Sequence, residues 1–206
     1  DGILLLLRGV NTNPGADPED MVALRMWIEP RRLITARQRK LLSIQDLKRE
    51  IEDGDGPNSI PELIVRIIER LADRISGFID SLEDQLGSLE TGETSPNYRV
   101  EVSQLRRQTA SVRGYLAPQR EALEVLIRRS GDVFENHLNE LREQSDRFVR
   151  YVEDLDLIRE RALVLQEELT NRMMEEQNSR MYTLSIVAVI FLPITFVSGV
   201  FGMNVA

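Results

Sequence analysis

The sequence predicts a mainly helical membrane-protein subunit with an α+β cytoplasmic domain, a long helical hairpin, and a very long stalk helix that continues into a transmembrane helix. Short apolar runs bounded by turn residues, then amphipathic helical periodicity, then an uncharged apolar end favour this fold class. The expected domains are 1–57, the remnant of an N-terminal α/β domain; 58–131, the helical hairpin; 132–180, the stalk helix; and 181–206, the first transmembrane helix. Because the chain opens without an initiator Met, we expect a partial, N-terminally truncated domain.

Composition limits the chemistry of the chain. The 206 residues carry 26 basic and 34 acidic side chains, for a net charge of −8. This balance argues against a nucleic-acid partner, which a basic face would have to bind, and an excess of carboxylates suits cations. With no cysteine and one histidine, His137, the chain cannot build a thiolate or Cys/His zinc site. We expect His137 to be an ordinary surface residue, and any bound metal to meet oxygen ligands.

Two short segments, 3–8 and 21–29, read as strands because turn formers at 11–15 separate them. Pro30 ends the second segment, and 33–36 is expected to return as its hairpin partner. Trp27 alternates with its neighbours along the second strand, so we expect it in the core.

Helices follow the strands. A short one is expected at 44–52, and Ser59 with Glu62 forms a capping box that opens a long amphipathic helix over 60–89. After a turn, 100–129 is expected to be helical again, with interruptions near Gly114 and Pro118. The two long helices should pack as an antiparallel hairpin.

A final helix is predicted from Asp132, since no Gly or Pro occurs in 132–192. Continued to Asn204, it would be about 110 Å long, too long for a compact domain. Its apolar seam should pack against the hairpin or against neighbouring stalks: Phe148, Val152, Leu155, Ile158, Ala162, Leu165, Leu169 and Met173. The carboxylates between them are either a solvated face, paired with Arg159, Arg161 and Arg172, or a funnel that collects cations. Among them, Glu167 is the candidate metal contact, because it lies on the extension of the seam described next.

The last segment is the strongest signal in the chain. No charged residue follows Arg180, so 181–206 offers 26 uncharged residues, where about 20 suffice to cross a bilayer. Arg172 and Arg180 on its amino side place the large domain in the cytoplasm.

One side of this span is small and weakly polar. Its residues recur at heptad spacing: Asn178, Met181, Ser185, Ala188, Leu192, Thr195, Gly199 and Gly202. The opposite side is expected to hold bulky apolar residues: Ile186, Val187, Val189, Ile190, Phe191, Ile194, Phe196, Val197 and Phe201. Such a seam fits either a helix that lines a water path or close packing of helices through small residues.

The end of the span carries the residues FGMN at 201–204, preceded by FLPITF at 191–196. Together they resemble the first transmembrane helix of the CorA superfamily of divalent-cation transporters, in which a Gly-Met-Asn signature closes the pore helix. Three further stretches are similar to the ZntB, or zinc-transporting, branch: YLAPQREAL at 115–123, RYVEDLD at 150–156 and LQEEL at 165–169. Met203 is a departure, since that branch often carries Val or Ile there and Met is the residue of the magnesium transporters.

The resemblance implies a homopentamer in the cell inner membrane that transports zinc, magnesium or both, with most of the chain in the cytoplasm and a second span after the first. Carried over, Gly202, Met203 and Asn204 form the selectivity motif. Asn178, Leu184, Leu192 and Thr195 line the pore.

The chemistry of these residues fits a hydrated ion. A ring of Asn204 amide oxygens could hold the water shell of a cation, and Leu184 and Leu192 could gate by dewetting. No resident cofactor is expected, only divalent cations as transported ligands. No nucleophile–base pair and no phosphate loop stands in the sequence, which argues against an enzyme. The alternative function is a membrane-anchored coiled-coil adaptor or sensor that does not transport.

Overall fold

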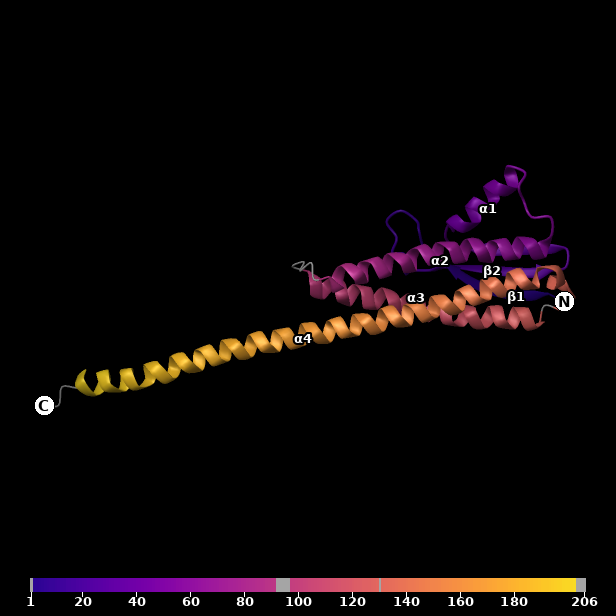
Figure 1. Cartoon of the computed structure of the whole chain (residues 1–206). Helices are drawn as coiled ribbons and strands as arrows, with labels where there is room; N and C mark the ends of the chain where they lie inside the picture. Colours follow the sequence, from indigo (N-terminus) through magenta and orange to yellow (C-terminus); the bar gives the residue numbers. More distant parts are fainter. Residues whose placement is uncertain (1, 92–96, 130, 203–206) are drawn as a thin grey trace. The chain divides into compact units, whose positions relative to one another are not determined.

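The structure is a computed structural model that describes residues 2–91, 97–129 and 131–202. Its elements in chain order are β1 (Ile3–Gly9), β2 (Val22–Glu29), β3 (Arg32–Arg37), α1 (Leu42–Glu52), α2 (Ile60–Glu90), α3 (Tyr98–Arg129), the 3₁₀ helix η1 (Gly131–His137) and α4 (Leu138–Gly202) (Figure 1). The chain divides into two compact units, Asp1–Leu163 and Val164–Ala206.

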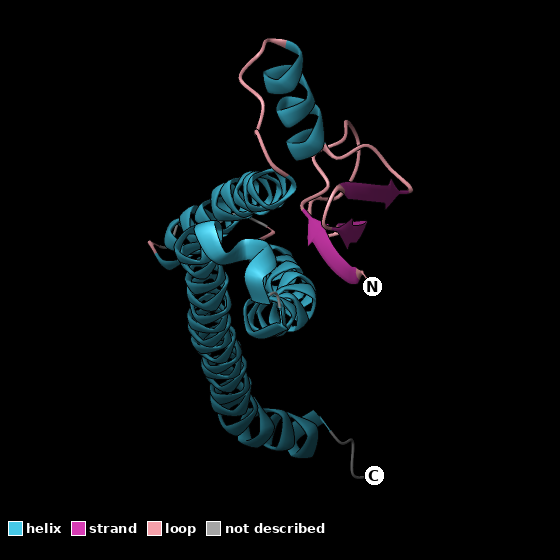
Figure 2. Cartoon of the chain, turned by 90° about the vertical axis from the view of Figure 1, so that its right-hand side faces the viewer, coloured by secondary structure: helices cyan, strands magenta, loops and turns pink. Residues whose placement is uncertain are grey.

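The three strands form one antiparallel sheet in the order β1-β2-β3, which includes the predicted hairpin of β2 and β3. Alternation sends one set of side chains to a buried face, among them Leu7 opposite Leu24 and Leu5 opposite Met26. Figure 2 shows the sheet lying to one side of the helices of this unit. At the end of β1 the backbone approaches α2 so closely that a Cβ on Gly9 would lie 2.6 Å from Cδ2 of Leu71.

The expectation that Trp27 lies in the core was wrong. Its side chain is 38% exposed on the outer face of the sheet, where Leu4 and Ile34 stand directly opposite it on the two neighbouring strands. The indole N–H donates to Glu29 Oε1 at 2.8 Å. Trp27 shares its face of β2 with Arg25 and Glu29, whereas the other face of this strand is apolar throughout.

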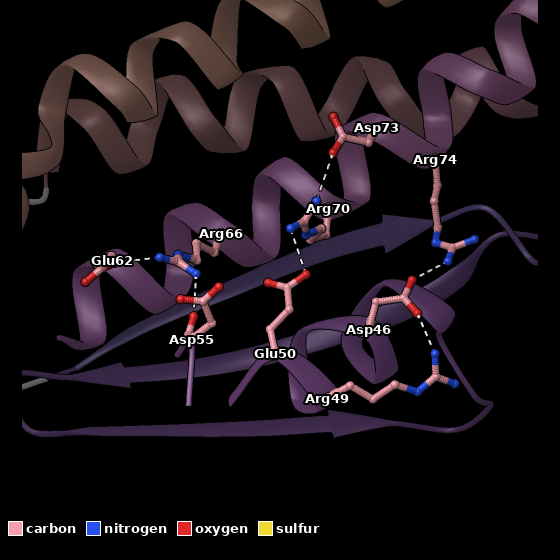
Figure 3. Close-up of polar contacts among 9 residues, drawn as sticks. All are labelled: Asp46, Arg49, Glu50, Asp55, Glu62, Arg66, Arg70, Asp73 and Arg74. Carbon is pink, nitrogen blue, oxygen red and sulfur yellow. Dashed lines mark hydrogen bonds and ion pairs between the residues drawn. The ribbon is translucent and has the colours of Figure 1, made fainter. Parts of the chain in front are cut away.

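Ion pairs join helix α1 to α2. It buries only Ser43 and Leu47. Arg74 of α2 pairs with Asp46, and Arg70 pairs with Glu50 at 2.7 Å (Figure 3). Gly54 ends the helix in the left-handed region at φ +91°, where a residue without Cβ is favoured.

The predicted start of α2 is confirmed. The Ser59 hydroxyl accepts a hydrogen bond from the Glu62 N–H at 3.2 Å, and the Glu62 carboxylate accepts from the Asn58 N–H at 2.8 Å. The apolar stripe of α2 is buried along its whole length, from Ile64 to Leu89. This burial, rather than propensity alone, keeps a 31-residue helix intact.

The predicted interruption of α3 was wrong. The helix runs without a break from Tyr98 to Arg129 through Gly114 and Pro118. Pro118 removes one helical hydrogen bond, but Leu116 and Leu123 on either side of it are buried and hold both halves in place. Helices α2 and α3 contact each other as the expected antiparallel hairpin (Figure 1).

The last helix begins at Leu138 instead of Asp132, because residues 131–137 form a 3₁₀ helix that brings Phe134 into the core. From there α4 buries the predicted seam as far as Leu165, including Phe148, Leu155 and Ile158. The Tyr151 hydroxyl donates to the Ala72 carbonyl of α2 at 3.1 Å. Further along the seam, Leu169 is half-buried and Met173 is exposed.

Candidate functional site

The predicted pore positions all lie on α4, and all of them are exposed. Leu184 and Leu192 are 63% and 70% exposed, and Asn178 and Thr195 are exposed as well. Within the described residues, α4 is the one helix that is long and apolar enough to cross a membrane, and none of that apolar stretch is buried. Among the described residues, the end of α4 therefore has no partner that buries it.

Helix geometry gathers these positions on one side. At about 100° per residue, Asn178, Ser185, Leu192 and Thr195 share a stripe about 100° wide, and Leu184 lies about 20° beyond it. Phe196 falls inside the stripe, which corrects the expectation that it lies opposite. The bulky residues that do lie opposite are Ile186, Val187, Ile190, Ile194, Val197 and Phe201.

The hydroxyls of this stretch are bonded within the helix. Thr195 Oγ1 donates to the Phe191 carbonyl at 2.8 Å, and Ser185 Oγ donates to the Met181 carbonyl at 2.9 Å. Because each hydrogen is engaged, each oxygen presents only lone pairs outward. Both positions on the stripe are therefore acceptors, the polarity that suits the water shell of a cation.

Pro193 stands inside this part of α4. It has no N–H to donate to the Val189 carbonyl one turn earlier, so that carbonyl loses its helical partner. The helix nevertheless continues to Gly202. The other two residues of the selectivity motif, Met203 and Asn204, lie outside the described residues.

Glu167 is an exposed side chain on the same helix. In the part of the chain that the structure describes, no group of three or more acidic or histidine side chains is arranged to hold a metal ion. The predicted role of Glu167 as a metal contact therefore remains a prediction. It would require ligands from several copies of the chain.

The alternative reading of the stalk carboxylates, as a salt-bridged surface, holds for some of them. The Asp156 carboxylate accepts two hydrogen bonds from Arg113 of α3. Arg113 Nε donates to Oδ1 at 2.5 Å, and Nη2 donates to Oδ2 at 3.0 Å. This hydrogen bonding lowers the pKa of Asp156 below its usual value. Arg161 binds Glu90 of α2, with Nε 2.9 Å from Oε1. Sequence reasoning missed both partners, since they lie 43 and 71 residues away with no local pattern to connect them.

His137 lies among several acidic side chains, two of which are distant in sequence. It is half-buried, and its Nδ1 lies 2.9 Å from Glu140 Oε2. Both line a cleft of about 310 Å³ that also takes in Glu62, Glu69 and Glu143. His137 closes η1, which contacts α2.

Comparison with known proteins places the chain. The family model described as "CorA-like Mg2+ transporter protein" matches residues 1–206. The chain belongs to the CorA-like family. Among curated relatives of this family, the divalent cation transporter CmaX of Pseudomonas aeruginosa is 40% identical over 210 residues, covering 100% of this chain and 63% of its own length. The zinc transport protein ZntB of Pectobacterium carotovorum is 37% identical over 210 residues. The match covers 99% of this chain and 63% of the ZntB sequence.

Solved structures agree with this membership. The full-length CmaX protein superposes with a TM-score of 0.91 at 40% identity, covering 100% of this CorA-like chain and 64% of its own. The CorA magnesium transporter of Methanocaldococcus jannaschii has a TM-score of 0.85 at 18% identity, a likeness of fold alone.

The CorA-like chain spans less than two thirds of the length of these curated relatives. Its family is one of divalent cation transporters, and the relatives named above are transport proteins. The predicted family and the mainly helical α+β fold class are therefore confirmed.

Proposed function

We propose that the full-length protein forms a homopentameric pore in the cell inner membrane that passes hydrated divalent cations, with the sheet, the hairpin and the stalk in the cytoplasm. The observation that carries the proposal is the uncharged end of α4, which is exposed throughout and runs into Gly202-Met203-Asn204. Lipid and neighbouring copies would supply the apolar partners that a single chain does not.

The two sides of α4 suit two environments. The stripe through Ser185, Leu192 and Thr195 includes the small residues Ala188 and Gly199 and two bonded hydroxyls, which fit a water path at the axis of a ring. Ile186, Ile190 and Phe201 on the far side fit lipid or a second span. A cyclic arrangement of identical copies brings the same stripe to the axis five times.

In this pore, ion binding and gating are assigned to different residues. Five Asn204 amides at the outer end would accept hydrogen bonds from the water shell of an ion and hold it without removing it. Leu192 and Leu184 would form two apolar constrictions that close by dewetting. Thr195 lies one turn beyond Leu192, and its outward lone pairs would receive the hydrated ion between the Asn204 ring and the first constriction.

Carboxylates at the cytoplasmic end would attract the same ions. Glu167 and the exposed glutamates that follow it on α4 give this stretch an excess of negative charge. In a ring of copies these side chains would face one volume of water and raise the local concentration of cations.

The ion set follows from ligand type. Relatives bear the names of zinc and divalent cation transporters, and the family model bears the name of magnesium transporters. The stripe offers no nitrogen or thiolate ligand, and it offers acceptor oxygens that suit a hydrated ion of either kind. We propose that zinc and magnesium are both admitted.

The test is flux of zinc and of magnesium into liposomes that carry the full-length protein, with and without a proton gradient. Asn204→Ala should abolish the flux and leave assembly intact, while Asn139→Ala, the same change at an exposed position outside the span, should leave the flux unchanged. Undiminished flux in Asn204→Ala would remove the amide ring from the mechanism. Flux that requires the gradient would make the protein a coupled transporter.

Assembly is measured separately. The mass of the detergent-solubilised full-length protein should correspond to five copies, and a stable dimer would contradict the pore. Wild-type protein that assembles as expected but passes neither ion would instead support a membrane-anchored adaptor.

A further inference from the structure

Three methionines stand on α4 close to the start of its uncharged stretch. The side chains of Met173, Met174 and Met181 are 54%, 57% and 57% exposed. All three belong to the second unit of the chain, and the continuous helix α4 sets their relative positions. Ion binding and gating in the proposed pore involve none of these side chains.

Helix geometry separates the three methionines. At about 100° per residue, Met174 and Met181 fall in the middle of the stripe of pore positions, within about 20° of each other. Met173 falls about 40° outside the same stripe. At a rise of about 1.5 Å per residue, Met174 and Met181 are about 10.5 Å apart along the helix axis, which is about two turns.

The charged residues of the same segment avoid the stripe. Glu176 and Arg180 pair with each other at 3.6 Å on a different side of the helix. Every charged residue from position 170 to 180 lies at least about 60° outside the stripe: Arg172, Glu175, Glu176 and Arg180. Met174 and Met181 thus occupy the centre of a stripe that carries no charge in this segment.

The methionine side chain offers a thioether sulfur as a ligand. It is a soft, polarisable atom on an unbranched chain with three rotatable bonds, so several such sulfurs can converge on one point. Thioethers select Cu(I) and other soft ions, whereas magnesium takes oxygen ligands. In a cyclic ring of copies, each of the two positions would become a ring of sulfurs around one axis.

We propose that Met174 and Met181 form two thioether rings at the cytoplasmic end of the pore, and that these rings bind a soft monovalent cation, Cu(I) or Ag(I). The inference rests on the proposed function, because only a ring of copies brings these sulfurs to one axis. The bound ion occupies the path of the hydrated divalent cations, and its charge repels them. Flux of zinc and magnesium is therefore blocked while the soft ion is bound.

Silver ion is the probe, because it shares the ligand preference of Cu(I) and keeps one oxidation state in the assay. Magnesium flux into liposomes that carry the full-length protein is measured in chloride-free buffer with increasing silver nitrate, and each variant is compared with its own flux without silver. Met174→Leu combined with Met181→Leu removes both sulfurs and nearly conserves the volume. The silver concentration that halves the flux should rise at least about tenfold in this double variant, a loss of about 1.4 kcal/mol of binding free energy or more.

Met173→Leu is the matched control, since it removes the neighbouring sulfur that lies outside the stripe. The silver concentration that halves the flux should be the same in this variant as in the wild type. Wild-type flux that silver does not reduce would overturn the proposal. Equal silver sensitivity in the wild type and the double variant would overturn it as well.

A measurement on the wild-type protein needs neither flux nor a variant. The oxidant tert-butyl hydroperoxide converts exposed methionines to the sulfoxide, and a sulfur that binds silver is not free to react. At a silver concentration about ten times the Kd, oxidation of Met174 and Met181 should slow by about tenfold, because the unbound fraction falls by the factor 1 + [L]/Kd. Met173 should oxidise at the same rate with and without silver, as read by fragmentation mass spectrometry.

Equal slowing at all three methionines, or at none, would overturn the proposal. Protection of Met174 and Met181 in a wild-type protein that passes no divalent cation would support the thioether rings and contradict the proposed transport. The two proposals can therefore fail separately.

Discussion

The two parts of α4 use apolar residues in opposite ways. Up to Leu165 the helix buries a seam that includes Phe148, Leu155 and Ile158, and its other faces are charged or exposed. From Thr170 to Gly202 every residue is exposed, although this part is the more apolar of the two. A single helix thus passes from a stretch that completes a core to a stretch with no core to complete.

The contrast shows that hydrophobicity and burial are separate properties. In the first part an apolar stripe faces α2 and α3, and polar residues face water, as the periodicity requires. In the second part apolar residues surround the helix on nearly all sides, the pattern of a helix whose surroundings are themselves apolar. Amphipathicity points to a protein partner, and its loss points to a bilayer.

The largest effect should come from the buried part. Phe148→Ala removes a fully buried ring and should lower the free energy of unfolding of unit 1 by about 3–5 kcal/mol. Phe201→Ala, at a side chain 87% exposed, should leave that free energy unchanged. Denaturant unfolding of the full-length protein in detergent, followed by the fluorescence of Trp27, measures both. Equal losses in the two variants would mean that both parts of α4 belong to one core.

A charge placed in the second part should come next. Ile190→Arg puts a guanidinium on the side opposite the stripe and should cost about 2.5–3.5 kcal/mol of insertion free energy. Met174→Arg, also on an exposed position of α4 but before the uncharged stretch, should insert normally. The fraction of protein recovered in washed membranes distinguishes them. Normal insertion of Ile190→Arg would argue against lipid on that side.

The smallest effect concerns the ion pair at the base of α4. The pKa of Asp156 is lowered by its hydrogen bond from Arg113, so the pair stabilises unit 1 above the unfolded carboxyl pKa of about 3.9 and is lost as the pH falls through the lower folded value. Both side chains are about one-third exposed, which limits the contribution to about 1 kcal/mol.

Asp156→Asn should therefore unfold at lower denaturant concentration than wild type at pH 7, and the difference should shrink below about pH 4 as the wild-type carboxylate protonates. Glu175→Gln, which neutralises an exposed carboxylate of the same helix, serves as the control and should show no such change. A difference that persists unchanged at pH 3 would mean that Asp156 acts through packing.

Much of this fold was accessible from the sequence because the signals are local. The capping box at Ser59, the period of α2 and the charge-free end of α4 each depend on residues a few positions apart. Trp27 shows a limit: alternation gives a strand two faces and does not by itself say which one is covered. Pro118 shows another, since its effect on a helix depends on whether distant side chains hold the two halves in line.

Some features of the candidate site could be predicted from local spacing, and others could not. The positions of Leu184, Leu192 and Thr195 on one side of a helix follow from spacing alone. The partners of Asp156 and Arg161 depend on which segments meet in the folded chain. The roles proposed for Glu167 and Asn204 require several copies to meet, which spacing within one chain does not reveal.

The order of the elements along the chain also sets the order in which the ribosome delivers them. Every described core residue of unit 1 lies at or before Ala162, and the uncharged stretch begins only at Met181. Domains generally fold as units, N-terminal first, during synthesis. The sheet, the hairpin and the first part of α4 have therefore all been synthesised before the first residue of the uncharged stretch, so unit 1 needs nothing from that stretch to complete its core. The uncharged stretch is thus the last part of α4 to leave the ribosome, after the residues that fix the start of the same helix in unit 1.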